Sequence, residues 1–500
     1  MVTLLILDGF GYSLENYGNA ILQAGTPYLD KLLKMYPHTL LKCCGKSVGL
    51  ESGQMGGSEV GHLNIGAGKI VVQELTRINT AIENGNFFNN KAFIKAIEHC
   101  KKFNSSLHLI GLLSDGGIHS KIKHLTALVK LANMHGLENV YIHAFMDGRD
   151  TPKDSGLQIV SQLESKIEGK AKIASLCGRI YAMDREKRYD RLQKAYDMLV
   201  LGRAEGYYQN AIDALEESYK NNIFDEFVEP SIIGKVKKIQ SNDSVIFFNF
   251  RADRARELTQ AIAEQNIKQM QLVNLKNIYF VTMCEYDENF KNVDVAFEKN
   301  IIKNNLASII SKNNMKQFHI SETTKYAHVT FFLNGGIEKP YEGEERCLIE
   351  SYDTIDFSTV PQMKAFDITE RTMEAIASGK FGFVVVNLSN ADMIGHTGNF
   401  EATKTAIKCI DKCAYAIALA TLAVDGHCII TADHGNAEVM LDKNGDVVTS
   451  HTMNPVRFIL ASEKYKDVEL KSGGALCNIA PTILKLLDIE LPKDMEESLF

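Results

Sequence analysis

Three clusters of acidic and histidine side chains have the chemistry of a site for divalent metal ions. They contain Asp8, then Asp392 with His396, and finally Asp433, His434 and His451. Asp392 and His396 stand four residues apart, which places them on one face if this segment is helical. Carboxylate and imidazole ligands together suit Mn²⁺, Zn²⁺ or Fe²⁺. A single aspartate after a strand is usually a turn residue, but the whole set provides enough ligands for two ions.

A glycine-rich segment, residues 51–62, contains a serine with the features of a nucleophile. Ser58 follows Gly56 and Gly57, which allow another group to approach the backbone closely. A helix beginning near Ser58 would present free N–H groups to a phosphate. A metal ion beside the hydroxyl would lower its pKa and activate the oxygen. The composition fits equally well a flexible loop in which Ser58 caps a helix.

The middle of the chain carries arginines that suit an anionic ligand. Arginine pairs with phosphate or carboxylate through two parallel hydrogen bonds. These arginines follow predicted strands rather than lining a helix, which favours a pocket; the alternative for each is a surface ion pair with a neighbouring aspartate. The candidate set is His119, Arg149, Asp150, Arg179, Arg185, Arg251 and Arg254.

The elements that must position these residues alternate along the chain, which predicts α/β architecture with mostly parallel sheets. In such sheets ligands bind beyond the carboxyl ends of the strands, where the polar candidates stand. The predicted strands are residues 2–7, 107–113, 140–145, 244–250, 278–283, 383–388 and 428–431. Helical patterns include residues 26–35, 124–133, 369–377 and 403–423.

The order of the clusters predicts two domains, one of them discontinuous. Metal-ligand candidates lie near both ends of the chain, whereas the arginines lie between them. The two ends must therefore form one domain, residues 1–73 and 300–500, into which residues 74–299 are inserted. A chain of 500 residues is also longer than a single core usually supports.

Composition excludes several other classes of protein. The formal net charge of −7 argues against a nucleic-acid partner held by bulk charge. The 10 cysteines form no CxxC pair, and free thiols fit a reducing compartment. The first apolar run is short and lacks a basic region before it, and no stretch is long enough to span a bilayer. We therefore expect a cytoplasmic protein with no membrane partner.

Taken together, these motifs resemble the cofactor-independent phosphoglycerate mutases of the alkaline-phosphatase-like metalloenzyme superfamily. The similarity runs along essentially the whole chain. So many long motifs in one order make the match highly specific. The matching stretches are residues 7–11, 54–64, 114–120, 147–151, 178–185, 248–256, 322–330, 392–398, 431–436 and 451–452.

The resemblance implies an α/β fold with an alkaline-phosphatase-like discontinuous domain and an inserted transferase domain. It implies interconversion of 3-phosphoglycerate and 2-phosphoglycerate, in glycolysis and gluconeogenesis, through a phosphoserine and without 2,3-bisphosphoglycerate. The implied cofactors are two Mn²⁺ or other divalent ions, and the implied assembly is a monomer. One ion would be held by Asp392, His396 and His451, and the other by Asp8, Ser58, Asp433 and His434.

The resemblance also assigns catalytic and substrate-binding roles. Ser58 would be the nucleophile, Asp150 the acid and base, and Lys325 a further positive charge at the phosphoryl group. Substrate would be bound by His119, Arg149, Asp150, Arg179, Arg185, Arg251, Arg254 and Lys325.

Four positions depart from the usual family pattern. Gly57 replaces an asparagine before the nucleophile, and Lys121 replaces a histidine. Ala252 and Ala391 each replace a proline. None of these changes removes a candidate ligand or nucleophile, so we expect activity. The alternatives are a metal-dependent phosphatase or sulfatase, another phosphomutase such as a phosphopentomutase, and a catalytically silent metal-binding protein.

Overall fold

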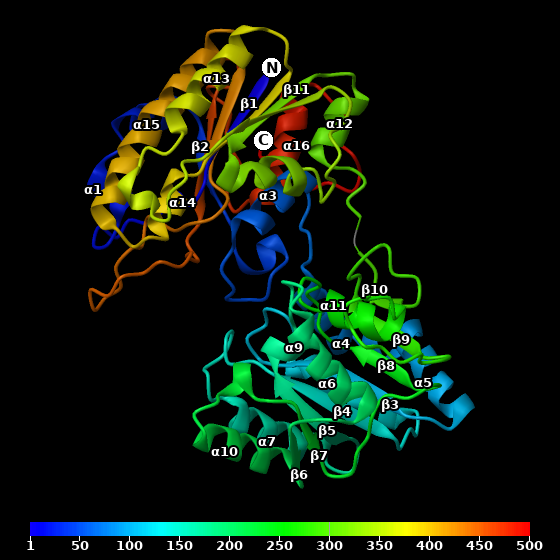
Figure 1. Ribbon diagram of the computed structural model, residues 1–500. Helices are drawn as coiled ribbons and strands as arrows, with labels where there is room; N and C mark the ends of the chain where they lie inside the picture. The colour runs from blue at the N-terminus through cyan, green and yellow to red at the C-terminus, as the bar shows by residue number, and fades with distance from the viewer. Residues whose placement is uncertain (300) are drawn as a thin grey trace. The chain divides into compact units, whose positions relative to one another are not determined.

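Two mainly parallel β-sheets organise the chain, and each belongs to a separate unit (Figure 1). The computed structural model describes residues 1–299 and 301–500. The first unit is Met1–Gln73 with Ile301–Phe500, and the second is Glu74–Asn300. The α/β class predicted from the sequence is confirmed. The predicted domain edge at residue 300 lies outside the described residues.

The sheet of the first unit has the order β12-β11-β13-β1-β14-β15-β2. Its first five strands run parallel, whereas β15 pairs antiparallel with both β14 and β2. The strands are β1 (Val2–Leu7), β2 (His38–Leu41), β11 (Gln317–Glu322), β12 (Glu344–Ile349), β13 (Phe383–Leu388), β14 (His427–Thr431) and β15 (Val456–Ala461). The helices are α1 (Ala20–Ala24), α2 (Pro27–Met35), α3 (Ser58–Ala67), α12 (Leu306–Lys312), α13 (Ala365–Ala377), α14 (Asn390–Gly395), α15 (Phe400–Leu422) and α16 (Ile479–Leu486).

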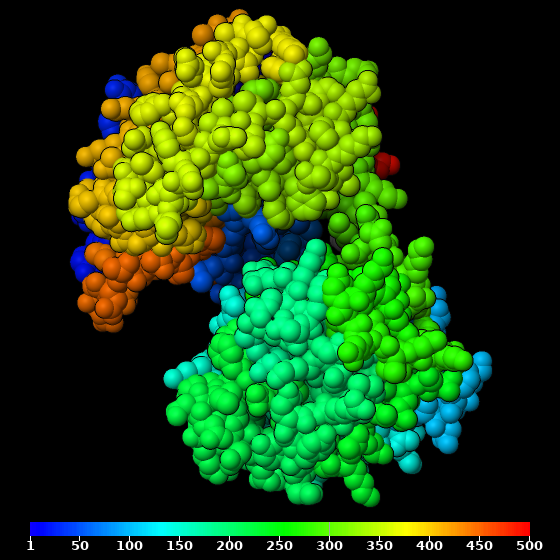
Figure 2. All heavy atoms as spheres, in the orientation of Figure 1, coloured from blue at the N-terminus to red at the C-terminus, as the bar shows by residue number. Residues whose placement is uncertain are grey.

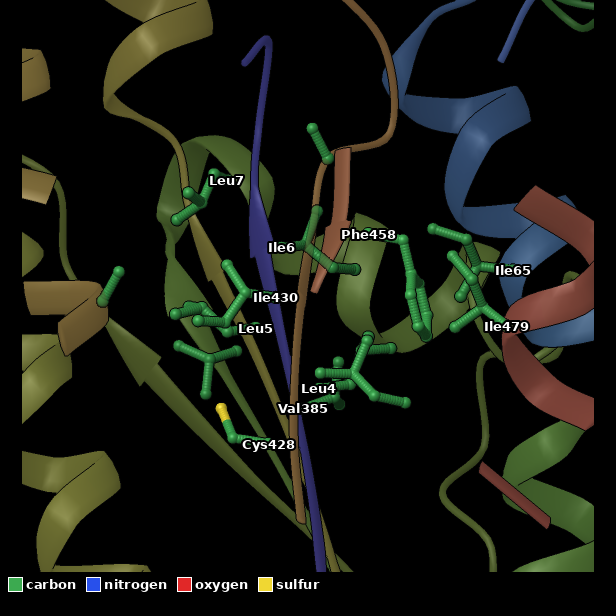
Figure 3. Packing of buried hydrophobic residues seen from close by; sticks show 14 of the residues in the cluster. Leu4, Leu5, Ile6, Leu7, Ile65, Val385, Cys428, Ile430, Phe458 and Ile479 are labelled. Atoms are coloured by element: carbon green, nitrogen blue, oxygen red, sulfur yellow. The ribbon is translucent and has the colours of Figure 1, made fainter. Parts of the chain in front are cut away.

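The central strands of this sheet are buried on both faces, which explains why they read as continuous apolar runs. Every residue of β1, β13 and β14 is buried. Successive side chains of a strand alternate between faces. Figure 3 shows Leu5 and Leu7 on one face of β1, and Leu4 and Ile6 on the other. Helices therefore cover both faces and hold the strand ends in place.

The sheet of the second unit has the order β10-β9-β8-β3-β4-β5-β7-β6, and only the β5–β7 pair is antiparallel. The strands are β3 (Leu107–Leu113), β4 (Val140–Met146), β5 (Lys172–Gly178), β6 (Gly206–Tyr208), β7 (Ser231–Ile233), β8 (Ser244–Phe247), β9 (Tyr279–Cys284) and β10 (Asp294–Phe297). The helices are α4 (Glu74–Glu83), α5 (Lys91–Phe103), α6 (Ile122–Met134), α7 (Gly156–Ile167), α8 (Arg179–Ala182), α9 (Tyr189–Tyr196), α10 (Ala211–Lys220) and α11 (Arg256–Thr259).

All seven predicted strands exist; three have the predicted bounds, and four differ only at their ends. The prediction of a strand over residues 244–250 is three residues too long at its end, because β8 ends at Phe247. Beyond it, the side chain of Asn249 accepts the N–H of Leu112 in place of a strand partner. Helix α15 begins earlier than predicted because Asn399 caps it and accepts the N–H of Ala402.

Two further features of the described residues bear on function. No helix among them is both long and apolar enough to cross a membrane.

A short turn closed by the Leu441–Val447 bridge projects from the surface of the first unit, where Figure 2 shows it in orange. This turn leads directly into the segment that carries His451.

We predict that Gly66→Ala destabilises the first unit. Gly66 lies in α3, and a Cβ added there would stand 1.9 Å from the carbonyl oxygen of Leu333. Backbone atoms on both sides must shift, so we expect a loss of about 2–3 kcal/mol in the free energy of unfolding. Glu59→Ala, an exposed position on the same helix, is the control for denaturant unfolding. An equal effect of the two substitutions would contradict this packing.

Candidate active site

Three adjacent parallel strands of the first unit each deliver one carboxylate to the same edge of the sheet. Asp8 directly follows β1, and Asp433 lies just beyond β14. Asp392 lies in α14, which begins just after β13. Because β13, β1 and β14 are neighbours, the three side chains meet, and all are buried. The carboxyl end of a parallel sheet is the usual place for a ligand site.

Ser58 lies within this group of carboxylates as the first residue of α3. Its Oγ is 3.1 Å from Asp8 Oδ1 and 2.9 Å from His434 Nε2. The residue that caps α3 is Gly57, so the alternative reading of Ser58 as a helix cap is wrong. The free N–H groups of a helix start therefore lie next to the hydroxyl, which favours an anion there.

Lys325 is the buried cation of this site. Its Nζ donates hydrogen bonds to Asp8 Oδ1 at 2.8 Å, Asp392 Oδ2 at 2.6 Å and Ser58 Oγ at 2.6 Å. Burial lowers the pKa of Lys325, but Asp8 and Asp392 raise it by more, so the amine stays charged. Burial raises the pKa of Asp8, and Lys325 pulls it well below its ordinary value.

Asp392, His396 and His451 converge in a geometry that suits a cation. The Nε2 atoms of His396 and His451 lie 3.1 and 3.3 Å from Asp392 Oδ1. Each histidine uses Nδ1 on a carbonyl, at 2.7 Å on Thr449 and 2.8 Å on Gly56. A carbonyl only accepts, so each Nδ1 carries a proton, and the two Nε2 atoms lie 3.1 Å apart. Histidine metal ligands are usually oriented in this way.

A second cluster joins Asp8, Asp433 and His434 around Ser58. His434 Nε2 lies 3.4 Å from Asp8 Oδ1 and 3.6 Å from Asp433 Oδ2. Asp433 Oδ2 is buried and has no hydrogen-bond partner among the described residues. Burial lowers the pKa of His434, but Asp433, Asp8 and Asp392 raise it to about 10. The excess of negative charge and the unsatisfied oxygen fit a divalent cation held by these residues.

Two buried residues that the sequence did not single out position this site. Asn387, at the end of β13, donates to Asp8 Oδ2 at 2.8 Å and lies 3.0 Å from His62 Nε2. His62 Nδ1 in turn lies 2.8 Å from the carbonyl of Ser58 and 3.3 Å from Asp433 Oδ2. The signal for Asn387 was a single amide inside an apolar strand. His62 is the last residue of the glycine-rich segment, four residues after Ser58, and carried no further signal.

Glu438 is a third residue that sequence reasoning missed. Its Oε2 accepts the backbone N–H groups of Gly11 at 3.2 Å and Asn436 at 2.9 Å. Its Oε1 accepts from Asn454 at 3.1 Å and from the hydroxyl of Thr452. One buried carboxylate therefore ties together the loops that follow Asp8, Asp433 and His451.

In the second unit, an arginine–aspartate network surrounds His119. Arg179 Nη1 donates to Asp147 Oδ1 and Asp150 Oδ2, both at 2.6 Å. His119 Nε2 lies 3.8 Å from the same oxygen of Asp150. Burial and the nearby Arg179 lower the pKa of His119 to about 4, so the ring is neutral at pH 7. Arg179 therefore fixes the orientation of Asp150, to which the family resemblance assigns the role of acid and base.

Asp253 joins Arg185 and Arg251 to His119. Its Oδ1 lies 3.6 Å from His119 Nδ1 and 3.3 Å from Arg251 Nε, and its Oδ2 is 3.2 Å from Arg185 Nη1. Burial, and then Arg185 and other nearby arginines, lower the pKa of Arg254. Such crowding of guanidinium groups favours an anionic ligand.

Arg149 stands somewhat apart from this network. Its guanidinium is 55% exposed and lies 3.6 Å from Glu226 Oε1. The structure thus brings the predicted metal ligands, Ser58 and Lys325 together in the first unit. It gathers the predicted histidine, aspartate and arginines in the second unit.

Comparisons with known proteins agree with this picture. The family model described as BPG-independent PGAM N-terminus matches residues 78–288. The 2,3-bisphosphoglycerate-independent phosphoglycerate mutase of Clostridium botulinum (strain Langeland) is 49% identical over 99% of this chain and 98% of its own length. Mutase 1 of the same name from Methanosarcina acetivorans is 50% identical over 98% and 96%. The crystal structure of Leishmania mexicana phosphoglycerate mutase superposes with a TM-score of 0.71 at 30% identity, covering 100% of this chain and 97% of that one.

Carboxylates, imidazoles and a hydroxyl that meet at the strand ends of an α/β fold define a metal-binding enzyme. With relatives of this identity along its whole length, the chain belongs to the family of 2,3-bisphosphoglycerate-independent phosphoglycerate mutases. The family resemblance predicted from the motifs is confirmed.

We predict that Lys325→Met destabilises the metal-free protein more than the metal-loaded protein. Removing the cation leaves Asp8 and Asp392 buried without their hydrogen-bonded partner. We expect a loss of about 3–5 kcal/mol in a chelator, measured by denaturant unfolding. We expect an added divalent cation to restore most of this stability, because its charge would compensate the same carboxylates. Lys364→Met, which removes a lysine paired with Asp367 at 3.4 Å, is the control. An equal loss with and without metal would contradict the charge argument.

Proposed function

We propose that this protein interconverts 3-phosphoglycerate and 2-phosphoglycerate without 2,3-bisphosphoglycerate. The observation that carries the proposal is the hydroxyl of Ser58, which starts a helix and is contacted by Asp8, His434 and Lys325. A hydroxyl in such a setting suits attack on phosphorus, because positive charge and free N–H groups surround the phosphoryl oxygens. The relatives that carry this enzyme name share about half of their residues with the chain.

We propose that two divalent ions, Mn²⁺ in the first instance, complete the site. Asp392, His396 and His451 would hold one ion. The other would be held by Asp8, Ser58, Asp433 and His434. When bound, such ions neutralise charge on phosphoryl oxygens and lower the pKa of an adjacent hydroxyl. The Leishmania mexicana mutase structure was determined at low cobalt concentration, which agrees with a divalent transition metal in the family.

We assign the covalent step to Ser58. Its oxygen, whose proton is released to solvent before the attack and taken up again when the cycle ends, forms a bond to phosphorus while the bond from phosphorus to the 3-oxygen of glycerate breaks, giving a phosphoserine. Asp150 donates a proton to the departing oxygen, and it then removes the proton of the 2-hydroxyl. That hydroxyl oxygen attacks the phosphoserine and releases Ser58. Lys325 stays protonated and balances the charge on the phosphoryl oxygens.

We assign substrate binding to the second unit, which makes it the transferase domain and the first unit the phosphatase-like domain. Arg179 fixes Asp150 through its 2.6 Å hydrogen bond, so the acid and base has one orientation. Arg185, Arg251 and Arg254 would bind the carboxylate and phosphate of the substrate, together with His119 and Arg149. Neutral His119 can accept or donate a hydrogen bond to a glycerate hydroxyl without adding charge.

We also propose a cytoplasmic monomer. The ten cysteines of the sequence are all free thiols, most of them buried, which fits a reducing compartment. The monomer follows from the family resemblance, and size-exclusion chromatography with light scattering tests it directly.

The test of the proposed function is conversion of 3-phosphoglycerate followed by phosphorus NMR, with Mn²⁺ present and bisphosphoglycerate excluded. We expect a 2-phosphoglycerate signal that disappears on chelation of the metal. Ser58→Ala removes the nucleophile, so we expect at least a 10⁴-fold loss of turnover, on the order found for nucleophile deletions. Ser311→Ala, which alters a serine bonded to the carbonyl of Glu342, is the control and retains activity.

The same spectra separate the mutase from the phosphatase alternative. Release of inorganic phosphate without 2-phosphoglycerate would assign the site to a metal-dependent phosphatase. Substantial mutase turnover by Ser58→Ala would overturn the phosphoserine step while leaving the overall reaction in place.

We predict that Gly57→Asn is accepted by the fold and raises mutase turnover several-fold. The backbone of Gly57 is extended, with φ −167°, and an added Cβ would lie 3.5 Å from the ring of His451, an ordinary contact. Asparagine is also a good helix cap, worth a few tenths of a kcal/mol over glycine. The new amide would donate a hydrogen bond to the phosphoryl group. Gly57→Leu has the same size and no donor, so an equal gain in that variant would contradict the reason given.

A further inference from the structure

A small apolar cavity lies in the first unit, apart from the metal ligands. Its volume is about 110 Å³, and it lies between α1 and α2 on one side and β1, β14 and β15 on the other. Aliphatic side chains form a large part of its lining. They include Leu7, Ile21, Leu29, Leu33, Ile430 and Ile459. Figure 3 shows that Leu7 and Ile430 project from the same face of the sheet.

One lining residue of this cavity, Arg457, is a cation with no acidic partner among the described residues. Arg457, on β15, lies with its guanidinium carbon 4.6 Å from the ring centre of Tyr12. Within residues 1–299 and 301–500, the Arg457 guanidinium has no ion-pair or side-chain hydrogen-bond partner. A half-buried guanidinium stacked on an aromatic ring is held in place and keeps its hydrogen-bonding donors available.

One acidic residue, Asp30, also lines the cavity, from the α2 side. It is exposed to solvent, and the Thr26 hydroxyl donates to it at 3.5 Å. The lining of the cavity therefore contains the guanidinium of Arg457 and the solvent-exposed carboxylate of Asp30. Leu22, which is 42% exposed, also lines the cavity, so the cavity is open to solvent there.

We propose that this cavity binds a small aliphatic monocarboxylate. Its carboxylate would pair with Arg457 in the bidentate manner that arginine favours. Its chain would fill the aliphatic interior, as apolar ligands fill preformed cavities. A cavity of about 150 Å³ holds a benzene ring, so the smaller volume here limits the buried part of the ligand to a few carbon atoms.

The site is distinct from the active site, although the two share a wall. Leu7 and Ala432 line the cavity, and each directly precedes a carboxylate of the active site, Asp8 or Asp433. Neither of those aspartates lines the cavity. The chain of a bound monocarboxylate would therefore lie against the segments that position the metal ligands, and the ligand would not compete for the metal.

The first test is thermal unfolding of the full-length protein with four probes of stated chemistry. Hexanoate has both the chain and the carboxylate, hexanol has the chain alone, acetate the head group alone, and hexylamine the opposite charge. We expect hexanoate at tens of millimolar to raise the Tm by roughly 2 °C, more than any other probe. Equal protection by hexanol, or greater protection by hexylamine, would overturn the assignment of a carboxylate. No protection by hexanoate would overturn the site.

Two charge variants and one control sharpen this test. Arg457→Gln removes the cation, so we expect it to weaken hexanoate binding at least fivefold and leave hexanol unaffected. Asp30→Asn removes a nearby like charge, so we expect it to keep or strengthen hexanoate binding. Lys31→Gln removes a positive charge from the same helix but does not line the cavity. Equal loss in the Arg457 and Lys31 variants would indicate general screening and would overturn the proposal.

Methyl NMR of isoleucine-labelled protein locates the bound probe. Ile21, Ile430 and Ile459 line the cavity, whereas Ile246 lies in the core of the second unit. We expect hexanoate to shift the methyl signals of the first three and to leave Ile246 unchanged. Protection without shifts at the three cavity isoleucines would place the carboxylate elsewhere and overturn the assignment.

Discussion

The buried carboxylates of Asp8, Asp392 and Asp433 impose the strongest electrostatic constraint on this protein. Removing ionised carboxylates from water is costly unless opposite charge and hydrogen bonds replace the lost hydration. Lys325 bonds to two of the three, and Asn387 supports Asp8. This compensation is incomplete, because Asp433 keeps a buried oxygen without a hydrogen-bond donor. The remaining negative charge gives the site its affinity for cations.

A parallel sheet is well suited to hold such a cluster. The three carboxylates repel one another, so the segments that carry them must be held rigidly. Strands β13, β1 and β14 are hydrogen-bonded to one another and covered by apolar packing on both faces. Their carboxyl ends therefore form a rigid edge. The turns beyond that edge are tied down by Glu438, which holds four separate groups with one carboxylate.

In the second unit the functional candidates are positively charged arginines, and carboxylates hold them in place. Its arginines are held by aspartates, with Asp147 and Asp150 on Arg179, and Asp253 on Arg185 and Arg251. Buried Arg179 is fixed by two short bonds, whereas Arg185 and Arg251 are about half exposed. The outer guanidinium groups are therefore the ones that an anion from solvent can reach.

The sequence by itself determined the residue types of the site, the α/β class and the strand positions. Apolar runs that end in Asp8 or Asp433 are local patterns, and the spacing of Asp392 and His396 is a helical one. Tertiary structure decided which residues share one point in space. The joining of Arg185 to His119 through Asp253, and the support of Asp8 by Asn387, depend on contacts between distant segments. The cavity beside Arg457 belongs to the same category, because its walls come from strands and helices far apart in the chain. Local periodicity reports which face of an element is buried, but only packing fixes what that face meets.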